Sequence, residues 1–324
     1  MHSFLRQVQN TTNFVHFHRK RILVNAGALS LIGTFIYKNK SSSNENIRLA
    51  LAGCIAVTTV ETTFHMIDTV NIRSKANPQM GSSSMATLVT KIWAKEGIIG
   101  FGRGFSAAFY GGLFSGFSYF YLYKHFKQIL FEKYSNKIDV GWLCLLASFG
   151  AEFLTLIIKY PFDLVKCRLQ SVNAVFKYKN LFHAFRKEIK TNGVLSLYEG
   201  VTPFLATYCT FVALQFSIYE KMLDYYKKSR SVEQFKTQEL RINCFAGFAA
   251  GSIGSALTNG LEAVTVAKQT NPETKIMEMI REDGLKLLTR GLPARVVYNG
   301  GQSLVFFNLV LYIGKLFDVE LSDD

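Results

Sequence analysis

The segment at residues 161–170, PFDLVKCRLQ, decides the fold, because two weaker copies of it occur elsewhere in the chain. Residues 66–75 read MIDTVNIRSK, and residues 260–269 read GLEAVTVAKQ. The third position of each copy is acidic: Asp68, Asp163 and Glu262. Copies at a nearly constant step are typical of a chain built from repeated structural units. The sequence therefore predicts three repeats.

A second marker keeps the same step along the chain. A polar residue followed by glycine comes after each copy, at Glu96-Gly97, Asn192-Gly193 and Asp283-Gly284. Six residues after each of these glycines a second such pair begins, at Arg103-Gly104, Glu199-Gly200 and Arg290-Gly291. Two independent markers in the same register three times indicate that the repeat is real.

Each predicted repeat holds two long apolar stretches joined by a short amphipathic helix. The first stretches cover residues 47–75, 141–169 and 239–268, and the second cover 104–130, 200–226 and 291–317. Each is long enough to cross a bilayer, which takes about 20 residues in a helix. Strand-like alternation is missing, so helices are the way to satisfy the backbone in lipid. We predict an all-α membrane protein with six transmembrane helices in three repeats.

The predicted organisation has five parts. They are a basic and apolar N-terminal extension (1–46), repeat one (47–131), repeat two (139–228), repeat three (237–318) and an acidic tail (319–324).

Composition narrows the class of protein. The 324 residues are 49% hydrophobic and carry a formal net charge of +14. The basic residues are scattered between apolar runs, which favours anionic lipid or an anionic solute over nucleic acid as the partner. The five cysteines stand singly without metal-ligand spacing, and no catalytic triad or nucleotide fingerprint occurs. We therefore expect no metal, no nucleic-acid partner and no enzymatic activity.

The pattern Pro161-x-Asp163-x-x-Lys166-x-Arg168, together with the three repeats, resembles the mitochondrial carrier signature over roughly residues 47–318. The resemblance implies three two-helix repeats around a pseudo-threefold axis and a central substrate site. It also implies a multi-pass protein of the mitochondrial inner membrane, with the amphipathic helices at the matrix surface. In that family each signature base pairs with an acid of a neighbouring repeat and closes a gate on the matrix side.

This sequence departs from the implied matrix gate. The three acids are present, but Lys166 is the only base at its position, where Asn71 and Thr265 stand in the other copies. Pro161 is the only signature proline, so we expect a kink there. We expect Lys166 to pair with Asp68. Asp163 and Glu262 must then find other donors, for which the nearest bases in sequence are Arg73, Arg168 and Lys268.

The even helices also depart from the family pattern. An acid with a base three residues on is nearly absent from their ends, so a second gate is incomplete. Counting eight residues into each even helix gives the candidate substrate positions Gly111, Thr207, Tyr208, Tyr298 and Asn299, with Arg295 one turn away. Many carriers place arginine at such positions to bind carboxylate or phosphate. Its absence predicts a neutral or weakly charged substrate, if there is one.

Two features point to membrane and protein partners. Free N–H groups at a helix start suit phosphate, so Arg103-Gly104 and Arg290-Gly291 are candidate sites for cardiolipin headgroups. The extension contains the apolar run Ile22–Tyr37, which is too short to span and has basic flanks. It is either a targeting segment, a flap on this protein's own helices, or an anchor that packs residues 1–46 against a second protein. We predict the anchor.

The sequence leaves two functions open. Losses at both gates and at the central site favour a carrier-fold protein that no longer transports and serves as a lipid-binding structural subunit of an inner-membrane assembly. The alternative is an active solute carrier for a small neutral or weakly charged substrate.

Overall fold

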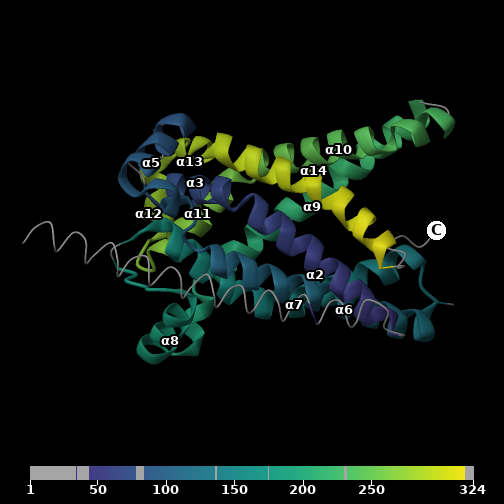
Figure 1. Cartoon of the computed structure of the whole chain (residues 1–324), viewed down its shortest axis with the longest axis horizontal. Helices are drawn as coiled ribbons and strands as arrows, with labels where there is room; N and C mark the ends of the chain where they lie inside the picture. Colours follow the sequence, from purple (N-terminus) through teal and green to yellow (C-terminus); the bar gives the residue numbers. More distant parts are fainter. Residues whose placement is uncertain are drawn as a thin grey trace, which may run out of the picture.

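The computed structural model describes residues 34, 44–77, 84–135, 137–173, 175–229 and 232–317, and nearly all of them are helical (Figure 1). No strand occurs among these residues. The predicted all-α fold is therefore confirmed. The predicted acidic tail lies outside the described residues, as does the N-terminal extension apart from Thr34 and its last three residues.

The helices follow the same order three times. Repeat one contains α2 (Glu45–Thr63), α3 (His65–Ala76), α5 (Met85–Phe101) and α6 (Phe105–Tyr134). Repeat two contains α7 (Val140–Ser171), α8 (Leu181–Asn192), η1 (Val194–Tyr198) and α9 (Val201–Ser229). Repeat three contains α10 (Val232–Leu257), α11 (Asn259–Thr270), α12 (Ile276–Asp283), α13 (Lys286–Thr289) and α14 (Leu292–Leu316). Each repeat is a long odd helical unit, a short helix and a long even helix.

The long helices form a ring. α2 packs on α6, α6 on α7, α9 on α10, α10 on α14, and α14 returns to α2. α7 and α9 meet where the rings of Tyr160 and Phe204 contact edge to face, 4.9 Å apart. The short helices α5, α8, α12 and α13 gather at one end of the ring, where α3 and α11 also lie (Figure 1). We call this the signature end.

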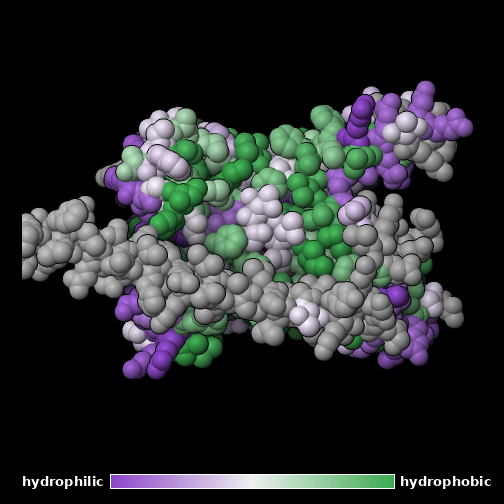
Figure 2. Space-filling view, viewed as in Figure 1, coloured by the Kyte–Doolittle hydropathy of each residue, from purple (hydrophilic) through white to green (hydrophobic). Residues whose placement is uncertain are grey.

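The outer surface suits a membrane. Length and apolar composition mark α7 from Trp142 and the segment Val194–Ser229 as candidate spans, and the bent pair α2–α3 as a third. Large apolar side chains are exposed on the outside of α7, among them Phe149 at 70% and Trp142 at 63%. Figure 2 shows hydrophobic residues across the middle of the visible face and hydrophilic ones toward both ends. Such a belt is what a bilayer requires.

The breaks in the odd helices lie where the sequence has no proline. α2 and α3 meet at Phe64 with a bend of 58°, and α10 ends at Thr258 before α11 begins. α7, in contrast, runs through Pro161 as one helix of 32 residues. The expected kink at the proline is thus not a break in the helix.

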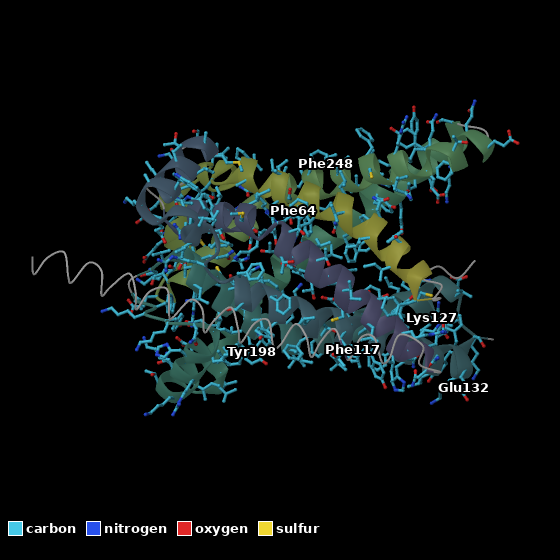
Figure 3. All side chains as sticks on the ribbon, in the orientation of Figure 1. Phe64, Phe117, Lys127, Glu132, Tyr198 and Phe248 are labelled. Carbon is cyan, nitrogen blue, oxygen red and sulfur yellow. The ribbon has the colours of Figure 1, made fainter. Side chains whose placement is uncertain are left out.

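A side chain explains how α7 tolerates the proline. Proline has no N–H, so the carbonyl four residues earlier loses its helical partner. That carbonyl belongs to Ile157, and the Tyr198 hydroxyl donates a hydrogen bond to it at 2.8 Å. Tyr198 lies beside α7 in Figure 3. The substitute donor satisfies the carbonyl that Pro161 leaves free.

The glycines of both markers have φ angles of the same sign. The six glycines of the two markers all have positive φ, and they are the glycines with positive φ in the described part of the chain: Gly97, Gly104, Gly193, Gly200, Gly284 and Gly291. A side chain is strained at such an angle, which accounts for glycine at these turns. The internal symmetry seen in the sequence is therefore present in the backbone.

Candidate functional site

The acids of the signature end face the inside of the ring, and one of them has the expected partner. Lys166 Nζ lies 3.1 Å from Asp68 Oδ2, and both side chains are largely buried. The pair joins α7 of repeat two to α3 of repeat one. Gln170 also donates a hydrogen bond to Asp68 at 3.1 Å. The structure thus contains the ion pair that was expected between Lys166 and Asp68.

Glu262 has partners that sequence reasoning missed. Lys75 Nζ lies 2.6 Å from Glu262 Oε2, and Arg295 Nε lies 3.0 Å from the same oxygen. Asn71, which stands at the position of the missing base, donates to Glu262 Oε1 at 3.3 Å and accepts a hydrogen bond from Lys75. Lys75 is one helical turn beyond Asn71. A second ion pair between repeats is therefore made by a base displaced by one turn.

The three bases proposed to replace the missing ones have other partners. Arg73 binds Glu96 of α5 at 2.5 Å, Arg168 binds Glu199 at 2.7 Å, and Lys268 donates to the carbonyls of Pro272 and Thr274. The proposal of Arg73, Arg168 and Lys268 as donors to Asp163 and Glu262 is wrong. The reason is geometric for Arg73 and Arg168, because each lies two positions from an inward-facing residue and so points away from the axis. Lys268 lies three positions after Thr265 and reaches the backbone that follows α11.

Two of these arginines fasten adjacent repeats. Arg73 Nε donates to the carbonyl of Gln170, and Arg168 Nε donates to the carbonyl of Gln269, each at 3.0 Å.

On the amphipathic helix α5, burial alone would raise the pKa of Glu96. Hydrogen bonds from Arg73 and Arg103 outweigh burial and hold that pKa below its usual value.

The third gate position differs from the other two. Thr265 occupies the position of the base, and its hydroxyl is 2.8 Å from the hydroxyl of Thr207. Asp163 interacts electrostatically with Lys159 and Lys166, which lie on its own helix. Two of the three inter-repeat ion pairs are therefore present among the described residues, Lys166–Asp68 and Lys75–Glu262.

The candidate substrate positions on the even helices fall into two groups. Tyr298 Oη lies 3.5 Å from Glu61 Oε2, and the Tyr208 hydroxyl donates to Glu152 at 2.7 Å. Arg295 is 2% exposed and is held by Glu262 and by the Thr258 hydroxyl. The remaining three, Gly111, Thr207 and Asn299, contact neighbouring helices through Phe162, Thr265 and Gly251 respectively.

The structure adds Glu61, Glu152 and Lys159 to the inner face. A sequence signal for them exists, since inward positions recur every seven residues along these helices. Glu61, Asp68 and Lys75 are spaced by seven on α2 and α3, and Glu152, Lys159 and Lys166 are spaced by seven on α7. Extending the signature one and two heptads toward the N-terminus would have found Glu61, Lys159 and Glu152.

The opposite end of the ring lacks a complete acid–base set at the expected positions. Lys124 of α6 pairs with Glu45 of α2 at 3.1 Å. Tyr219 stacks on Phe307 with ring centroids 4.1 Å apart, so an aromatic pair joins α9 to α14 there. Glu220 is exposed.

The two candidate lipid positions differ in exposure. The Arg103 side chain is 43% exposed, at the N-terminus of α6, although Glu96 binds its Nε. Arg290 is 6% exposed and binds Asp283 at 2.7 Å. Arg103 is thus the better placed of the two to meet a headgroup.

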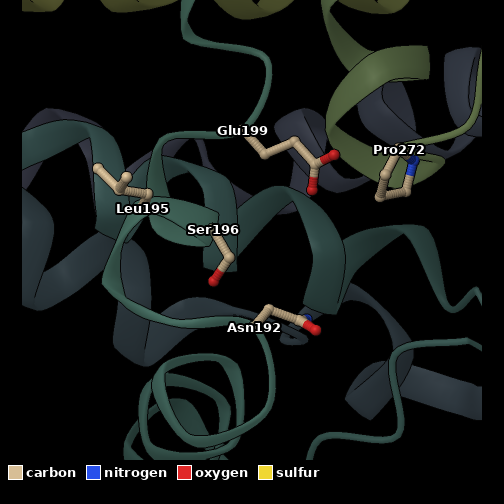
Figure 4. Close-up of a pocket in the computed structure, with 5 residues that line it drawn as sticks. All are labelled: Asn192, Leu195, Ser196, Glu199 and Pro272. Atoms are coloured by element: carbon tan, nitrogen blue, oxygen red, sulfur yellow. The ribbon is translucent and has the colours of Figure 1, made fainter.

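A surface pocket lies apart from the charged residues on the inner face of the ring. It has a volume of about 580 Å³ and is lined by Asn192, Leu195, Ser196, Glu199 and Pro272 (Figure 4). The Glu199 carboxylate at its wall already binds Arg168. The pocket lies at the signature end, where repeats two and three meet. Because the carboxylate in its wall already has a partner, the inner charged face is the stronger candidate for the functional site.

Known proteins with similar sequences agree with the three-repeat helical fold. The family model described as "Mitochondrial carrier protein" matches residues 42–134 and 140–230. The chain is 26% identical to "Mitochondrial substrate carrier family protein E" of Dictyostelium discoideum, over 80% of this chain and 91% of that protein. It is 24% identical to "Mitochondrial phosphate carrier protein 1, mitochondrial" of Arabidopsis thaliana, over 77% and 81%. It is 29% identical to "Nicotinamide adenine dinucleotide transporter 2, mitochondrial" of the same plant, over 80% and 75%.

Proposed function

This chain belongs to the mitochondrial carrier family, and from that premise we propose that it is an active carrier that moves a small solute across the mitochondrial inner membrane. The observation that supports transport most directly is the presence of two ion pairs at the signature end. Lys166–Asp68 and Lys75–Glu262 each join two different repeats. Contacts of this kind can hold one end of the ring shut and can be broken when the repeats move apart.

The structural-subunit interpretation has less support than transport. It rested on losses at both gates and at the central site, and Lys75 supplies one of the two missing bases of the matrix gate from a displaced position. The relatives named above are carriers or transporters by their printed names. The losses that favoured a non-transporting protein are therefore fewer than the signature positions alone indicate.

The proposal also includes a bound lipid and a partner protein. Cardiolipin is the expected bound lipid, with the exposed Arg103 and the N-terminus of α6 as its site. Residues 1–46 are the segment through which the chain would bind a second inner-membrane protein. Native-size mass measurement in mild detergent, with and without residues 2–40, tests the second feature: retention of a large assembly by the shortened chain would contradict it.

Exchange across a reconstituted membrane tests the main proposal. Purified protein in cardiolipin-containing vesicles should take up at least one labelled small solute with saturable kinetics. Lys166→Ala removes the base that binds Asp68 and should abolish that uptake, whereas Lys275→Ala, an exposed lysine on the short-helix surface, should leave it unchanged. Failure of the intact protein to exchange any member of a panel of anions, amines and neutral solutes would refute transport.

A further inference from the structure

Glu61 lies on the inner face of the ring. It belongs to α2, yet its carboxylate is 3.5 Å from the Tyr298 hydroxyl of α14 and 3.8 Å from Lys166 of α7. Those helices come from all three repeats. A side chain that meets all of them must point to the axis rather than to lipid. The Glu61 side chain is 19% exposed, so water reaches it there.

Glu152 and Lys159 occupy the same face of α7. Seven residues separate them, which is close to two helical turns. The Tyr208 hydroxyl of α9 donates to Glu152 at 2.7 Å, and Lys159 Nζ lies 5.4 Å from the centre of the Tyr208 ring. Lys159 also interacts electrostatically with Glu61, Glu152 and Asp163. One lysine therefore serves several carboxylates.

The carboxylates of this cluster differ in how well they are neutralised. Asp68 and Glu262 each have a base within 3.1 Å. Glu61 and Glu152 share their bases with other acids. Lys166 is closer to Asp68 than to Glu61, Lys159 is shared by Glu61, Glu152 and Asp163, and the hydrogen bond that Glu152 accepts comes from a neutral phenol. Thr155 lies on α7 between Glu152 and Lys159. It is 2% exposed, and its hydroxyl has no hydrogen-bond partner among the described residues.

A weakly neutralised carboxylate inside a membrane protein is costly unless a cation approaches it. We propose that Glu61 and Glu152 bind the protonated amine or guanidinium of a small solute, and that Lys159 binds its carboxylate where the solute has one. This deepens the proposed transport function and rests on it. Phosphate and dicarboxylates fit the site poorly, because Arg295 is already bound to Glu262.

The test compares cationic and anionic probes in the same vesicles. Uptake of labelled L-lysine and L-arginine is measured beside phosphate and succinate, for the wild type and for Glu61→Gln and Glu152→Gln. These substitutions keep side-chain size and remove the charge. Glu132→Gln is the matched control, since Glu132 is exposed at the end of the ring opposite the short helices (Figure 3). We expect amine uptake to fall about tenfold or more in the two inner variants, as the loss of a charged hydrogen bond predicts.

A binding readout separates the two proposals. L-Lysine or L-arginine should raise the thermal unfolding temperature of the wild type and of Glu132→Gln, but not of Glu61→Gln or Glu152→Gln. Uptake of phosphate or succinate that is unchanged in both inner variants, with no effect of the amines, would overturn this inference while leaving transport intact. Stabilisation by the amines without uptake of these four probes would uphold the binding site, and failure of the wider panel of anions, amines and neutral solutes as well would refute transport.

Discussion

Lys75 Nζ lies 2.6 Å from Glu262 Oε2, across the contact between repeats one and three, and is itself 1% exposed. The residue one turn before it, Asn71, stands where the gate base belongs. Asn71 still contacts both members of the ion pair, because it accepts a hydrogen bond from Lys75 and donates one to Glu262. The ion pair between these repeats is thus moved by one turn rather than lost.

Replacing Lys75 by glutamine, the residue type at the equivalent positions Gln170 and Gln269, should destabilise the protein. Glu262 would keep Arg295 but lose its closest base, so we expect a loss of roughly 1.5–3 kcal/mol, as for hydrogen bonds to charged groups. Thermal unfolding in detergent measures it. Lys275→Gln, which removes an exposed pair, should change stability by less than about 0.5 kcal/mol. Equal effects of the two substitutions would contradict the buried pairing.

The pair between Asp68 and Lys166 should show energetic coupling. Asp68→Asn leaves Lys166 with the more distant Glu61, Lys166→Gln removes that base from both Asp68 and Glu61, and the double variant removes both members of the closer pair. We expect the double variant to be more stable than the sum of the single effects predicts, with a coupling of about 1–3 kcal/mol in a double-mutant cycle. Strictly additive losses would mean that the two residues do not interact in the resting protein.

Tyr198→Phe should weaken α7 at its proline. The substitution removes the hydroxyl that satisfies the Ile157 carbonyl and keeps the ring. A loss of about 1 kcal/mol in unfolding free energy is expected for one net hydrogen bond. Tyr225→Phe is the control, because Tyr225 is 67% exposed on α9. No difference between the two would show that the carbonyl finds another donor.

Two marker glycines with positive φ should resist alanine for different reasons. Gly284 has φ of +48° and ψ of −128° with open space around it, whereas Gly291 has φ of +66° and a Cβ there would lie 2.0 Å from Ser74 Oγ. Gly284→Ala should cost about 1–3 kcal/mol from backbone strain alone, because its φ and ψ lie outside the left-handed region that other residues can enter. Gly291→Ala should be destabilising through a clash as well, because repeat three packs on repeat one at that point. Unfolding measurements test both variants, and a Gly291→Ala variant as stable as the wild type would contradict this packing.

Acid should weaken the contact between α3 and α5. The pKa of Glu96 is lower in the folded protein than its ordinary value of 4.5, since Arg73 and Arg103 bind the charged form. A lowered folded pKa gives stability that is complete above the ordinary value and is lost as pH falls through the folded one. The unfolding temperature should therefore drop on acidification below pH 4.5. That drop should be smaller in Glu96→Gln than in the wild type; an identical acid dependence would contradict the role of Glu96.

The sequence predicted the parts of the fold that repeat. The long apolar stretches predicted the long helices, and the marker glycines predicted the turns between them, where each glycine does adopt positive φ. The breaks in the odd helices were harder to predict. Pro161 lies inside a continuous helix, where a hydroxyl 37 residues further on satisfies the freed carbonyl. The breaks fall at Phe64 and Thr258, two residues before the positions that match the proline. Asn259-Gly260 follows the second break, but neither glycine nor proline stands beside the first.

The charged site was predictable only along single helices. Asp68 and Lys166 follow from the signature, but the partner of Glu262 depends on which bases of other helices reach it. Lys75 and Arg295 lie 187 residues before Glu262 and 33 after it in the sequence, and only the closed ring brings them together. Glu61 and Glu152 were missed for a different reason. They lie outside the signature, Glu61 one heptad before Asp68 and Glu152 two heptads before Lys166, so only the seven-residue spacing marks them.

The hydroxyl contact between Thr207 and Thr265 has a consequence for how the ring would open. At the signature end, ion pairs join repeat one to both of its neighbours, whereas repeats two and three meet there through this neutral contact and through hydrogen bonds such as that from Arg168 to a backbone carbonyl. Repeats two and three also pack on each other along α9 and α10. Opening of the signature end would therefore begin between repeats two and three, while the ion pairs keep repeat one joined to both neighbours.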